Sequence, residues 1–295
     1  MSEGPRVSVI VPAYNSEGTI AATLDALAGQ TFTDFETVVV DSSPGEATAR
    51  LMADRFPGVV FHHSRDRLLP HAARNRGVEL ARGEVLVFTD PDCVARPEWL
   101  KRLVAAHDQG HQVVGGAIEI EQDGWATTGI HLSKFSAWIG GGHAGTRADL
   151  ATANVLWSRP VLTQYGPFPA ETWCGDTEVS WRARAAGIEL RFEPDAVVSH
   201  THDTGLRTAW RERNVRGEDF ARMRIRVERW SRARAAAHLL SVPVVPALLL
   251  GRAFGYARRS GRLGEAVLSA PVQLLAYAGW SLGEGRASAR ALIRR

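Results

Sequence analysis

The sequence predicts an α/β protein with a Rossmann-like, doubly wound, mostly parallel sheet, followed by a C-terminal helical appendage that is both apolar and basic. Two observations predict the sheet: short β-branched runs alternate with helical patterns, and two of these runs end in an acid. Two long charge-free stretches near the C-terminus predict the appendage. Because 295 residues exceed the needs of one such domain, we expect a domain over residues 1–230 and the appendage over residues 231–295.

The first two predicted strands lie near the N-terminus. Arg6–Ala13 is an apolar, β-branched run, and residues 14–16 turn the chain into a helical pattern over Gly18–Ala28. Phe35–Val40 is the next strand, and it ends in Asp41. The alternation of strand and helix is typical of βαβ units, whose strands pair in parallel.

Two further strands and two helices continue the same pattern. A short helix around residues 51–52 leads to a strand over Val59–Phe61. Pro70–Arg82 reads as a helix that stops at Gly83, and Val85–Phe88 is the strand that follows it.

Two carboxylates, Asp90 and Asp92, follow this last strand and are separated by one residue. Side chains one residue apart lie on the same side of an extended segment, so both can reach one cation at the carboxyl edge of the sheet. Oxygen ligands on a divalent ion that also holds phosphates are a common way to bind a diphosphate. A solvated turn is the alternative for an isolated pair, but ligands of open α/β sheets gather at strand carboxyl ends.

Asp41 ends a neighbouring strand in the same way. Two strands that end in acids indicate one ligand spanning adjacent strand ends. The alternative is that Asp41 is a turn residue that terminates its strand.

Four motifs, in this order and spacing, resemble family-2 glycosyltransferases of the GT-A fold over about residues 6–230. They are VSVIVPAYN, VVVDSSP, AARNRGVELARGEVLVFTDPDC and GDTEVSWRARAAG. The resemblance implies an enzyme that moves a sugar from a nucleotide-diphosphate sugar to an acceptor hydroxyl, with inversion and with a divalent cation, Mg²⁺ or Mn²⁺.

The resemblance also implies roles for individual residues. Asp41 would contact the nucleotide base, Asp90 the ribose, and Asp92 the metal-bound diphosphate, while Asp176 would act as base on the acceptor hydroxyl. The implied nucleotide-binding set is Pro12, Ala13, Tyr14, Asn15, Asp41, Arg74 and Asp90. Because Asp176 opens a helical pattern, a helix cap is the alternative role for its carboxylate.

A histidine beyond Asp176 often completes the metal site in this family. His200 and His202 both follow a predicted strand, Ala196–Ser199. We prefer His200 as the ligand beside Asp92 because it adjoins that strand, and His202 stays open.

Other side chains near these motifs have two possible roles. Arg74 either binds the nucleotide by a charge-assisted bond or pairs with an acid, and Asn75 is expected to fasten backbone. Asn154 recurs near the acceptor site in the family, and Trp173 would either stack on a sugar or pack in the core. The Gly-rich stretch Trp138–Thr146 predicts a mobile loop without a stable element.

The sequence departs from the family in two places. The usual pair of acids before the late helix is Gly175-Asp176, which keeps only the second acid. Processive members carry a QxxRW motif, whereas Arg226–Trp230 ends in Arg-Trp without the Gln. We therefore expect a single addition, in which Asp176 takes the acceptor proton and in-line displacement inverts the anomeric carbon.

Charge is distributed unevenly along the chain. Residues 1–203 carry 17 Lys+Arg and 26 Asp+Glu, a balance of −9, and residues 204–295 carry 18 and 6, a balance of +12. A basic arm predicts an anionic partner. Nucleic-acid arms interleave charge with aromatic residues, whereas Ala235–Gly251 and Ala266–Gly283 are charge-free over 17 and 18 residues, so we expect no nucleic acid.

These two runs predict attachment to an anionic membrane surface. Seventeen residues rise roughly 26 Å as a helix, short of a hydrocarbon core of about 30 Å. Pro243, Pro246 and Pro271 would break or kink the helices. We expect peripheral or monotopic attachment at the cytoplasmic side of the membrane, with helices packed onto the domain as the alternative. Similar apolar pairs occur in family members that act on lipid-linked acceptors, so the expected acceptor is lipid-linked or a polysaccharide.

Composition agrees with a cytosolic bacterial enzyme. The start MSEGP shows no signal pattern, and Cys93 and Cys174 are expected to be thiols in a reducing compartment. Arginine (33) far exceeds lysine (2), which is typical of GC-rich genomes. These features, with the motifs, suggest synthesis of a cell-envelope polysaccharide.

Two other functions stay open. A sugar nucleotidyltransferase would carry a Gly-rich, basic phosphate loop near the first strand, which VPAYNSEGT lacks. A non-catalytic, membrane-bound sugar-binding module is conceivable because the acid pair is incomplete, but Asp90, Asp92 and Asp176 are all retained.

Overall fold

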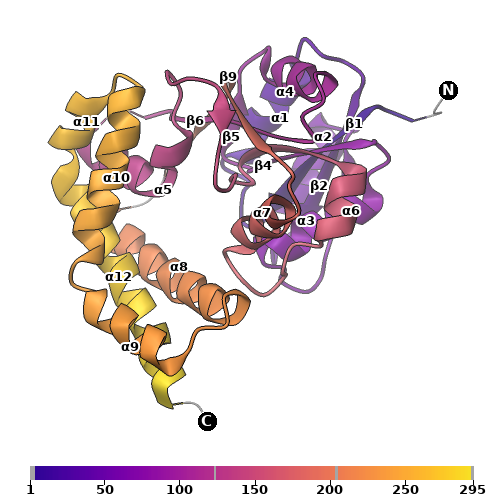
Figure 1. Cartoon of the computed structure of the whole chain (residues 1–295). Coiled ribbons are helices and arrows are strands. Elements are labelled where there is room, and N and C mark those ends of the chain that lie inside the picture. Colours follow the sequence, from indigo (N-terminus) through magenta and orange to yellow (C-terminus); the bar gives the residue numbers. More distant parts are fainter. Residues whose placement is uncertain (1–3, 123, 203–204, 294–295) are drawn as a thin grey trace. The chain divides into compact units, whose positions relative to one another are not determined.

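The computed structural model describes residues 4–122, 124–202 and 205–293, which form two compact units (Figure 1). The first unit is made of Met1–Glu119 and His143–Thr201, and the second of Ile120–Gly142 and His202–Arg295. The boundary predicted between residues 230 and 231 falls inside the second unit.

The first unit is built on a sheet whose N-terminal half is parallel. Its first strands lie in the order β3-β2-β1-β4, and each neighbouring pair is parallel. Their bounds are β1 (Val7–Ala13), β2 (Phe35–Asp41), β3 (Val60–His63) and β4 (Val85–Thr89). Ala13 pairs with Asp41, and Asp41 pairs with His63, so the carboxyl ends of these three strands meet at one edge.

The rest of the sheet is antiparallel where the paired residues are given. The order continues β8-β6-β9-β5, and β7 pairs with β9. These strands are β5 (Cys93–Ala95), β6 (Val113–Ile120), β7 (Gly145–Thr146), β8 (Asn154–Ser158) and β9 (Leu190–His200). The predicted α/β class is confirmed, and the parallel pairing lies in the half that carries the predicted nucleotide-binding residues.

Helices cover both faces of this sheet. Figure 1 shows α1 and α4 at one face and α3, α6 and α7 at the other. The helices of this unit are α1 (Ile20–Ala28), α2 (Ala47–Arg55), α3 (Pro70–Leu80), α4 (Trp99–Asp108), α6 (Arg159–Tyr165) and α7 (Gly175–Ala185). α3 begins with Pro70, which suits a first helical turn because that position needs no N–H donor.

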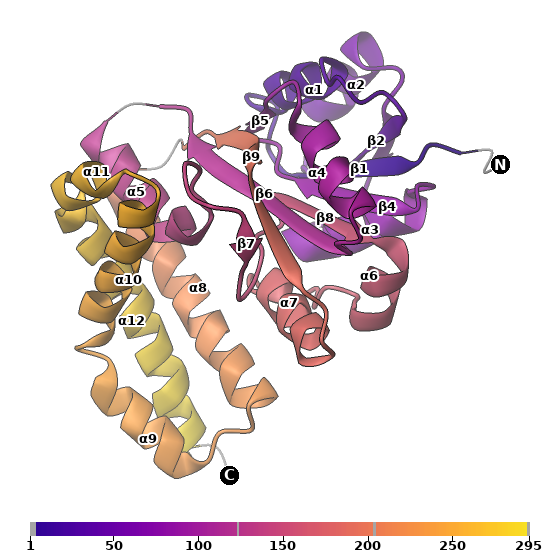
Figure 2. The ribbon, with the colours of Figure 1, turned by 45° about the horizontal axis from the view of Figure 1, so that its top comes forward.

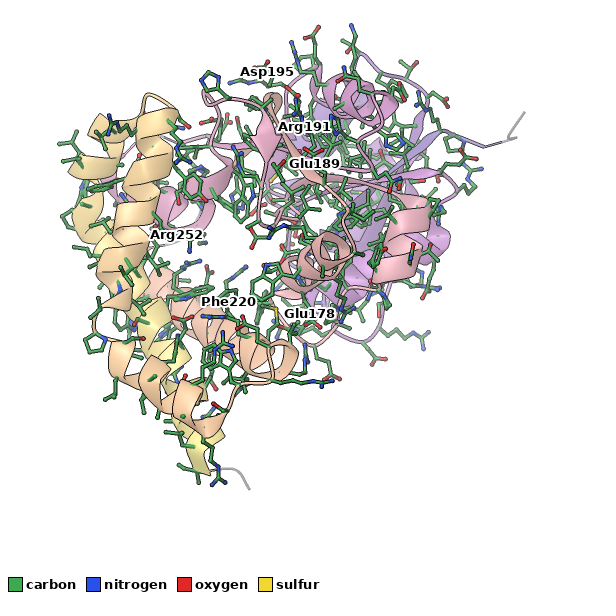
Figure 3. The ribbon with its side chains drawn as sticks, in the orientation of Figure 1. Glu178, Glu189, Arg191, Asp195, Phe220 and Arg252 are labelled. Carbon is green, nitrogen blue, oxygen red and sulfur yellow. The ribbon has the colours of Figure 1, made fainter. Side chains whose placement is uncertain are left out.

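The second unit is helical, and its two longest helices lie side by side (Figure 2). They are α8 (Leu206–Val227) and α12 (Ala270–Ile293), and α9 (Arg232–Ser241), α10 (Val245–Arg259) and α11 (Leu263–Leu268) lie between them in the chain. The unit also contains α5 (Trp125–Phe135) and the 3₁₀ turn η1 (Ser136–Trp138). A Cβ added at Gly283 of α12 would lie 2.1 Å from the carbonyl oxygen of Asn214 on α8, so glycine permits the close approach. Phe220 of α8, labelled in Figure 3, packs on Trp280 with ring centroids 5.2 Å apart.

The apolar C-terminal runs are broken where prolines predict it. Pro243 lies between α9 and α10, and Pro246 and Pro271 lie in the first turns of α10 and α12. Across the described residues, no single helix has both the length and the apolar composition to cross a membrane. α9 and α10 meet that test only as a pair, bent by 74°, as in a broken span or a re-entrant loop.

The predicted loop over Trp138–Thr146 is mostly irregular. The turn η1 ends at its first residue, and the short strand β7 forms its last two. The prediction of no stable element is therefore correct for residues 139–144 and wrong for the ends.

Candidate active site

Asp41, the last residue of β2, is fully buried at the carboxyl edge of the parallel strands. Its Oδ1 accepts a hydrogen bond of 2.6 Å from the Ser43 hydroxyl, and its Oδ2 lies 2.8 Å from Nδ1 of His63 on β3. The backbone N–H of Asn15 donates to the same Ser43 hydroxyl at 2.8 Å. These bonds hold the carboxylate in one orientation and join the ends of β1, β2 and β3.

The segment after β1 presents one aromatic face beside this edge. Tyr14 is exposed, and the guanidinium of Arg67 lies 4.5 Å from its ring centroid. Asn15 has a φ of 50°, in the left-handed region that asparagine tolerates better than most residues. Pro12 and Ala13 are buried in β1.

Asp90, the first acid after β4, forms an ion pair with Arg74 of α3. The Arg74 side chain is 5% exposed and that of Asp90 is 24% exposed, so water reaches the pair only from the Asp90 side. Of the two roles predicted for Arg74, the structure shows the pairing with an acid. A bond to a nucleotide stays a prediction.

Asp92, the second acid, lies beside a histidine and a cysteine. Its Oδ1 is 3.6 Å from Nε2 of His200 and 4.0 Å from Sγ of Cys93. Among the described residues, these three form the one group of at least three cation-binding side chains whose ligand atoms all lie within 4.8 Å of one another. Carboxylate oxygen and imidazole nitrogen are donors that Mn²⁺ and similar ions accept, so the residues fit a divalent cation. Burial and the charges of Asp92 and Asp90 raise the pKa of the Cys93 thiol well above its ordinary value.

The structure distinguishes the two histidines that the sequence left open. His200 ends β9 and lies beside Asp92. The ring of His202 instead contacts His131 of α5, with Nε2 and Nδ1 3.0 Å apart, and stacks on Phe135.

Asp176 lies in the first turn of α7, where its carboxylate is held on both oxygens. The N–H of Thr177 donates to Oδ1 at 2.8 Å, and the N–H and hydroxyl of Thr152 lie 3.3 and 3.4 Å from Oδ2. The Asp176 side chain is 21% exposed, so it remains accessible. Glu178, the other acid of this turn, is buried and paired with Arg182 at 2.5 Å (Figure 3 labels Glu178). Asp176 is therefore the acid of this turn that suits a role as base.

The missing acid at position 175 has a structural reason. The N–H of Gly175 donates to Nε2 of His71 at 3.1 Å, and a Cβ at 175 would lie 2.8 Å from His71 Cδ2 and 3.0 Å from the carbonyl oxygen of Pro169. His71 occupies the space that an acidic side chain would need.

His71 is a site residue that the sequence reasoning missed. It is 3% exposed on α3, its Nε2 lies 3.9 Å from Asp176 Oδ1, and its Nδ1 lies 3.4 Å from Arg74 Nη1. Its position three residues before Arg74 could have predicted this, because residues i and i+3 lie on the same face of a helix. α3 thus connects Asp90 after β4 with the start of α7.

Asn154 is a buried residue of the sheet, and its predicted place on the acceptor side stays a prediction. Its Oδ1 accepts from Trp99 Nε1 at 2.8 Å, and its Nδ2 donates to the carbonyls of Ala117 and Ala196 at 2.8 and 2.9 Å. The side chain is 1% exposed and fastens β8 to its neighbours, because both amide hydrogens are used inside the sheet.

Two neighbouring predictions have different outcomes. Asn75 fastens backbone as expected, since its side chain donates to the Phe168 carbonyl at 2.7 Å and accepts from the Phe168 N–H at 3.1 Å. Trp173 is half-buried just before α7, and its stacking on a sugar stays a prediction.

Comparison with known proteins gives a family and a fold. The sequence model of the family described as Glycosyl transferase family 2 matches residues 8–156. The chain is 30% identical over 204 residues to Glycosyltransferase AglE of Haloferax volcanii, which covers 66% of this chain and 67% of that protein. It is 28% identical over 157 residues to the undecaprenyl-phosphate 4-deoxy-4-formamido-L-arabinose transferase of Aeromonas hydrophila, covering 45% of this chain and 47% of that one.

A solved structure shares the fold across nearly the whole chain. It is the mannosyltransferase PcManGT from Pyrobaculum calidifontis in complex with GDP-Man and Mn²⁺. The TM-score is 0.64 at 22% identity, and the match covers 99% of this chain and 88% of that one.

Proposed function

Because the chain belongs to family 2 of the glycosyltransferases, we propose that it transfers one sugar from a nucleotide-diphosphate sugar to a hydroxyl of a lipid-linked or polysaccharide acceptor, with inversion. One observation carries this proposal: α3 connects Asp90, which adjoins the Asp92–His200 group, with Asp176. Two residues of α3 thereby contact the acid beside the group suited to a donor diphosphate and the acid suited to act as base on an acceptor.

The donor is bound at the carboxyl ends of the parallel strands. Asp41 contacts the base, Asp90 contacts the ribose, and Asp92 and His200 hold a divalent cation. When bound, that cation offsets the negative charge that develops on the departing diphosphate. Pairing with Arg74 orients Asp90 before any donor arrives.

Asp176 takes the proton of the acceptor hydroxyl. Thr152 and Thr177 fix the direction of its carboxylate, so little rearrangement is required when the acceptor binds. Attack from the side opposite the diphosphate, with one base, inverts the configuration at the anomeric carbon. Single addition remains part of the proposal because Arg226–Trp230 lacks the Gln of processive members.

We further propose that the protein works at the cytoplasmic side of a membrane, attached through the second unit. Leu240, Val244 and Leu248, around the break between α9 and α10, are 82%, 54% and 61% exposed. The balance of +12 over residues 204–295 favours an anionic lipid surface. A relative that acts on undecaprenyl phosphate supports a lipid-linked acceptor.

A panel of nucleotide sugars tests the enzymatic proposal. Purified full-length protein is mixed with Mn²⁺ or Mg²⁺ and each donor, beginning with GDP-mannose because PcManGT binds it, and release of nucleoside diphosphate is measured. Absence of hydrolysis and of transfer with every donor would favour the non-catalytic sugar-binding module.

Asp176→Asn tests the base. We expect transfer to fall about 10²–10⁴-fold with donor affinity nearly unchanged, because the amide keeps the size of the side chain but cannot accept the proton. Asp195→Asn, at a side chain that is 71% exposed, is the matched control and should transfer at the wild-type rate. A wild-type rate in Asp176→Asn would show that the base lies elsewhere.

A further inference from the structure

We propose that Cys93 is a third protein ligand of the cation site, so that this chain binds thiophilic divalent ions such as Zn²⁺ and Co²⁺ through Asp92, Cys93 and His200. The proposal rests on the proposed function because it concerns the same cation site. It adds a sulfur donor to an oxygen and nitrogen pair, which changes the class of metal ion that the site prefers.

The pairing of β5 with β9 places the cysteine beside the histidine. Cys93 and His200 are directly opposite each other in this antiparallel pair. Side chains at directly opposite positions lie on the same face of a sheet, with Cβ atoms about 4.5–5.5 Å apart. Asp92 precedes Cys93 in the chain and reaches the same point from the turn after β4.

The distances suit a small metal ion. The Asp92 oxygen lies 3.6 Å from the His200 nitrogen and 4.0 Å from the Cys93 sulfur, and all three ligand atoms lie within 4.8 Å. Zinc bonds of roughly 2.0–2.3 Å place tetrahedral ligand atoms roughly 3.3–3.8 Å apart. Closing the group around an ion therefore requires side-chain shifts of about an ångström or less.

The three ligands differ in their exposure to solvent, and the exposed side of the site is open to a substrate. Cys93 and His200 are 1% and 9% exposed, whereas the Asp92 side chain is 32% exposed. Three protein ligands with one solvent-facing position is the arrangement of catalytic zinc sites, in which water or substrate supplies the fourth ligand. A diphosphate oxygen could fill that position here.

The sulfur ligand favours soft metal ions over hard ones. Binding breaks the S–H bond, releases the proton to solvent and forms the metal–sulfur bond, with no change of oxidation state. Zn²⁺ and Co²⁺ compete well for a thiolate, whereas Mg²⁺ prefers oxygen and does not displace the proton. We therefore expect Mg²⁺ to bind through the oxygen of Asp92 and through water without Cys93, and Zn²⁺ and Co²⁺ to use all three side chains.

Cobalt reports the sulfur directly. Metal-free full-length protein is titrated with Co²⁺ alone, and the near-ultraviolet charge-transfer absorption of a cobalt–thiolate bond is recorded. The same protein is titrated with Zn²⁺ and with Mg²⁺ by calorimetry. No donor sugar is present, so failure of the transferase proposal in the donor panel and failure of this proposal are separate results.

The chain supplies a matched control because Cys174 is its other cysteine and is also buried. We expect the absorption in the wild type and in Cys174→Ser, and its loss in Cys93→Ser and Cys93→Ala. Zn²⁺ affinity should fall at least about tenfold in both Cys93 variants, with Mg²⁺ affinity unchanged. Cobalt binding without this absorption in the wild type, or the same absorption in folded Cys93→Ser, would overturn the proposal.

Discussion

Glu284 of α12 is a buried acid whose protonation belongs to the folded state. Its side chain is 4% exposed, and burial raises the pKa of Glu284 from 4.5 to about 7 despite the opposing charges of Arg224 and Arg213. Between these two pH values the folded chain holds a proton that the unfolded chain has lost. The contribution to stability is therefore fully present below about pH 4.5 and is lost as pH rises through 7.

We predict that Glu284→Gln removes the decrease in stability that Glu284 causes as the pH rises. Relative to the wild type, the variant should gain free energy of unfolding between pH 5 and pH 8. The gain should be up to about 3 kcal/mol, since each pKa unit corresponds to about 1.36 kcal/mol. Urea unfolding of both proteins at the two pH values measures it. His238, whose pKa is lowered by burial, has its Nε2 3.9 Å from Oε2 of Glu284, so both proteins also carry His238→Gln, which removes its titration from the comparison. An equal effect of the substitution at both pH values would contradict the prediction.

Most of the proposed chemistry could be predicted residue by residue from the sequence, and the misses share a cause. Asp92 is predictable because an acid after a strand is visible in one local segment, and Asp176 because the family resemblance assigns the base to an acid that opens a late helix. Cys93 and His71 were missed as site residues because their roles depend on partners 107 and 105 residues away, at His200 and Asp176. The hydrogen bonds of Asn154 within the sheet were not predictable for the same reason, since its partners are on other strands.

At the scale of elements, the contact between α8 and α12 depends on glycine. A Cβ at Gly283 would lie 2.1 Å from the Asn214 carbonyl oxygen, whereas one at Gly255 of α10 would meet nothing within 4 Å. Alanine is intrinsically better than glycine in a helix by about 1 kcal/mol. The two positions therefore separate helix propensity from packing.

We predict opposite effects for the two alanine substitutions. Gly283→Ala should destabilise the protein by about 1–3 kcal/mol because the helices must move apart. Gly255→Ala should stabilise it by up to about 1 kcal/mol. Denaturant midpoints and slopes measure both. Stabilisation by Gly283→Ala would mean that α8 and α12 approach less closely than described.

The strands and helices up to residue 90 are predictable because each combines a clear pattern of apolar residues with turn or helix-ending residues after it. The strand β9 lacks such a pattern, and it runs over Leu190–His200 although only Ala196–Ser199 is predicted. Pro194 and Asp195 interrupt the apolar pattern there, and both residues are disfavoured within strands. Cross-strand pairing overrides that local preference.

At the scale of the whole molecule, charge and exposed apolar side chains coincide in the second unit. We predict that full-length protein sediments with anionic liposomes at low salt and stays partly bound at high salt, because insertion of apolar side chains is not screened. Leu240→Ser combined with Leu248→Ser should lower binding at least about tenfold at high salt, since a buried leucine contributes roughly 1.5–3 kcal/mol.

Val215→Ser provides the comparison for this experiment. Val215 is 49% exposed on α8, outside both charge-free runs, so its substitution should leave sedimentation unchanged. If the full-length protein stays in the supernatant at low salt, the second unit is a packed structural unit and the acceptor need not be a lipid.

The second unit also has a consequence for synthesis on the ribosome. Ile130 of α5 shares a buried cluster with Ala209 and Val272, and Val272 is 142 residues (272 − 130) further along the chain. At roughly 5–20 residues per second, the nascent chain carries α5 for about 7–28 s before its partner helix is made. During that interval the apolar side of α5 depends on chaperones or on contacts with the growing chain, whereas the parallel strands can already pair. A chain that stops within α10 or α11 would therefore have its parallel strands formed and α5 in contact with α8, but it would lack the contact of Ile130 with Val272 of α12.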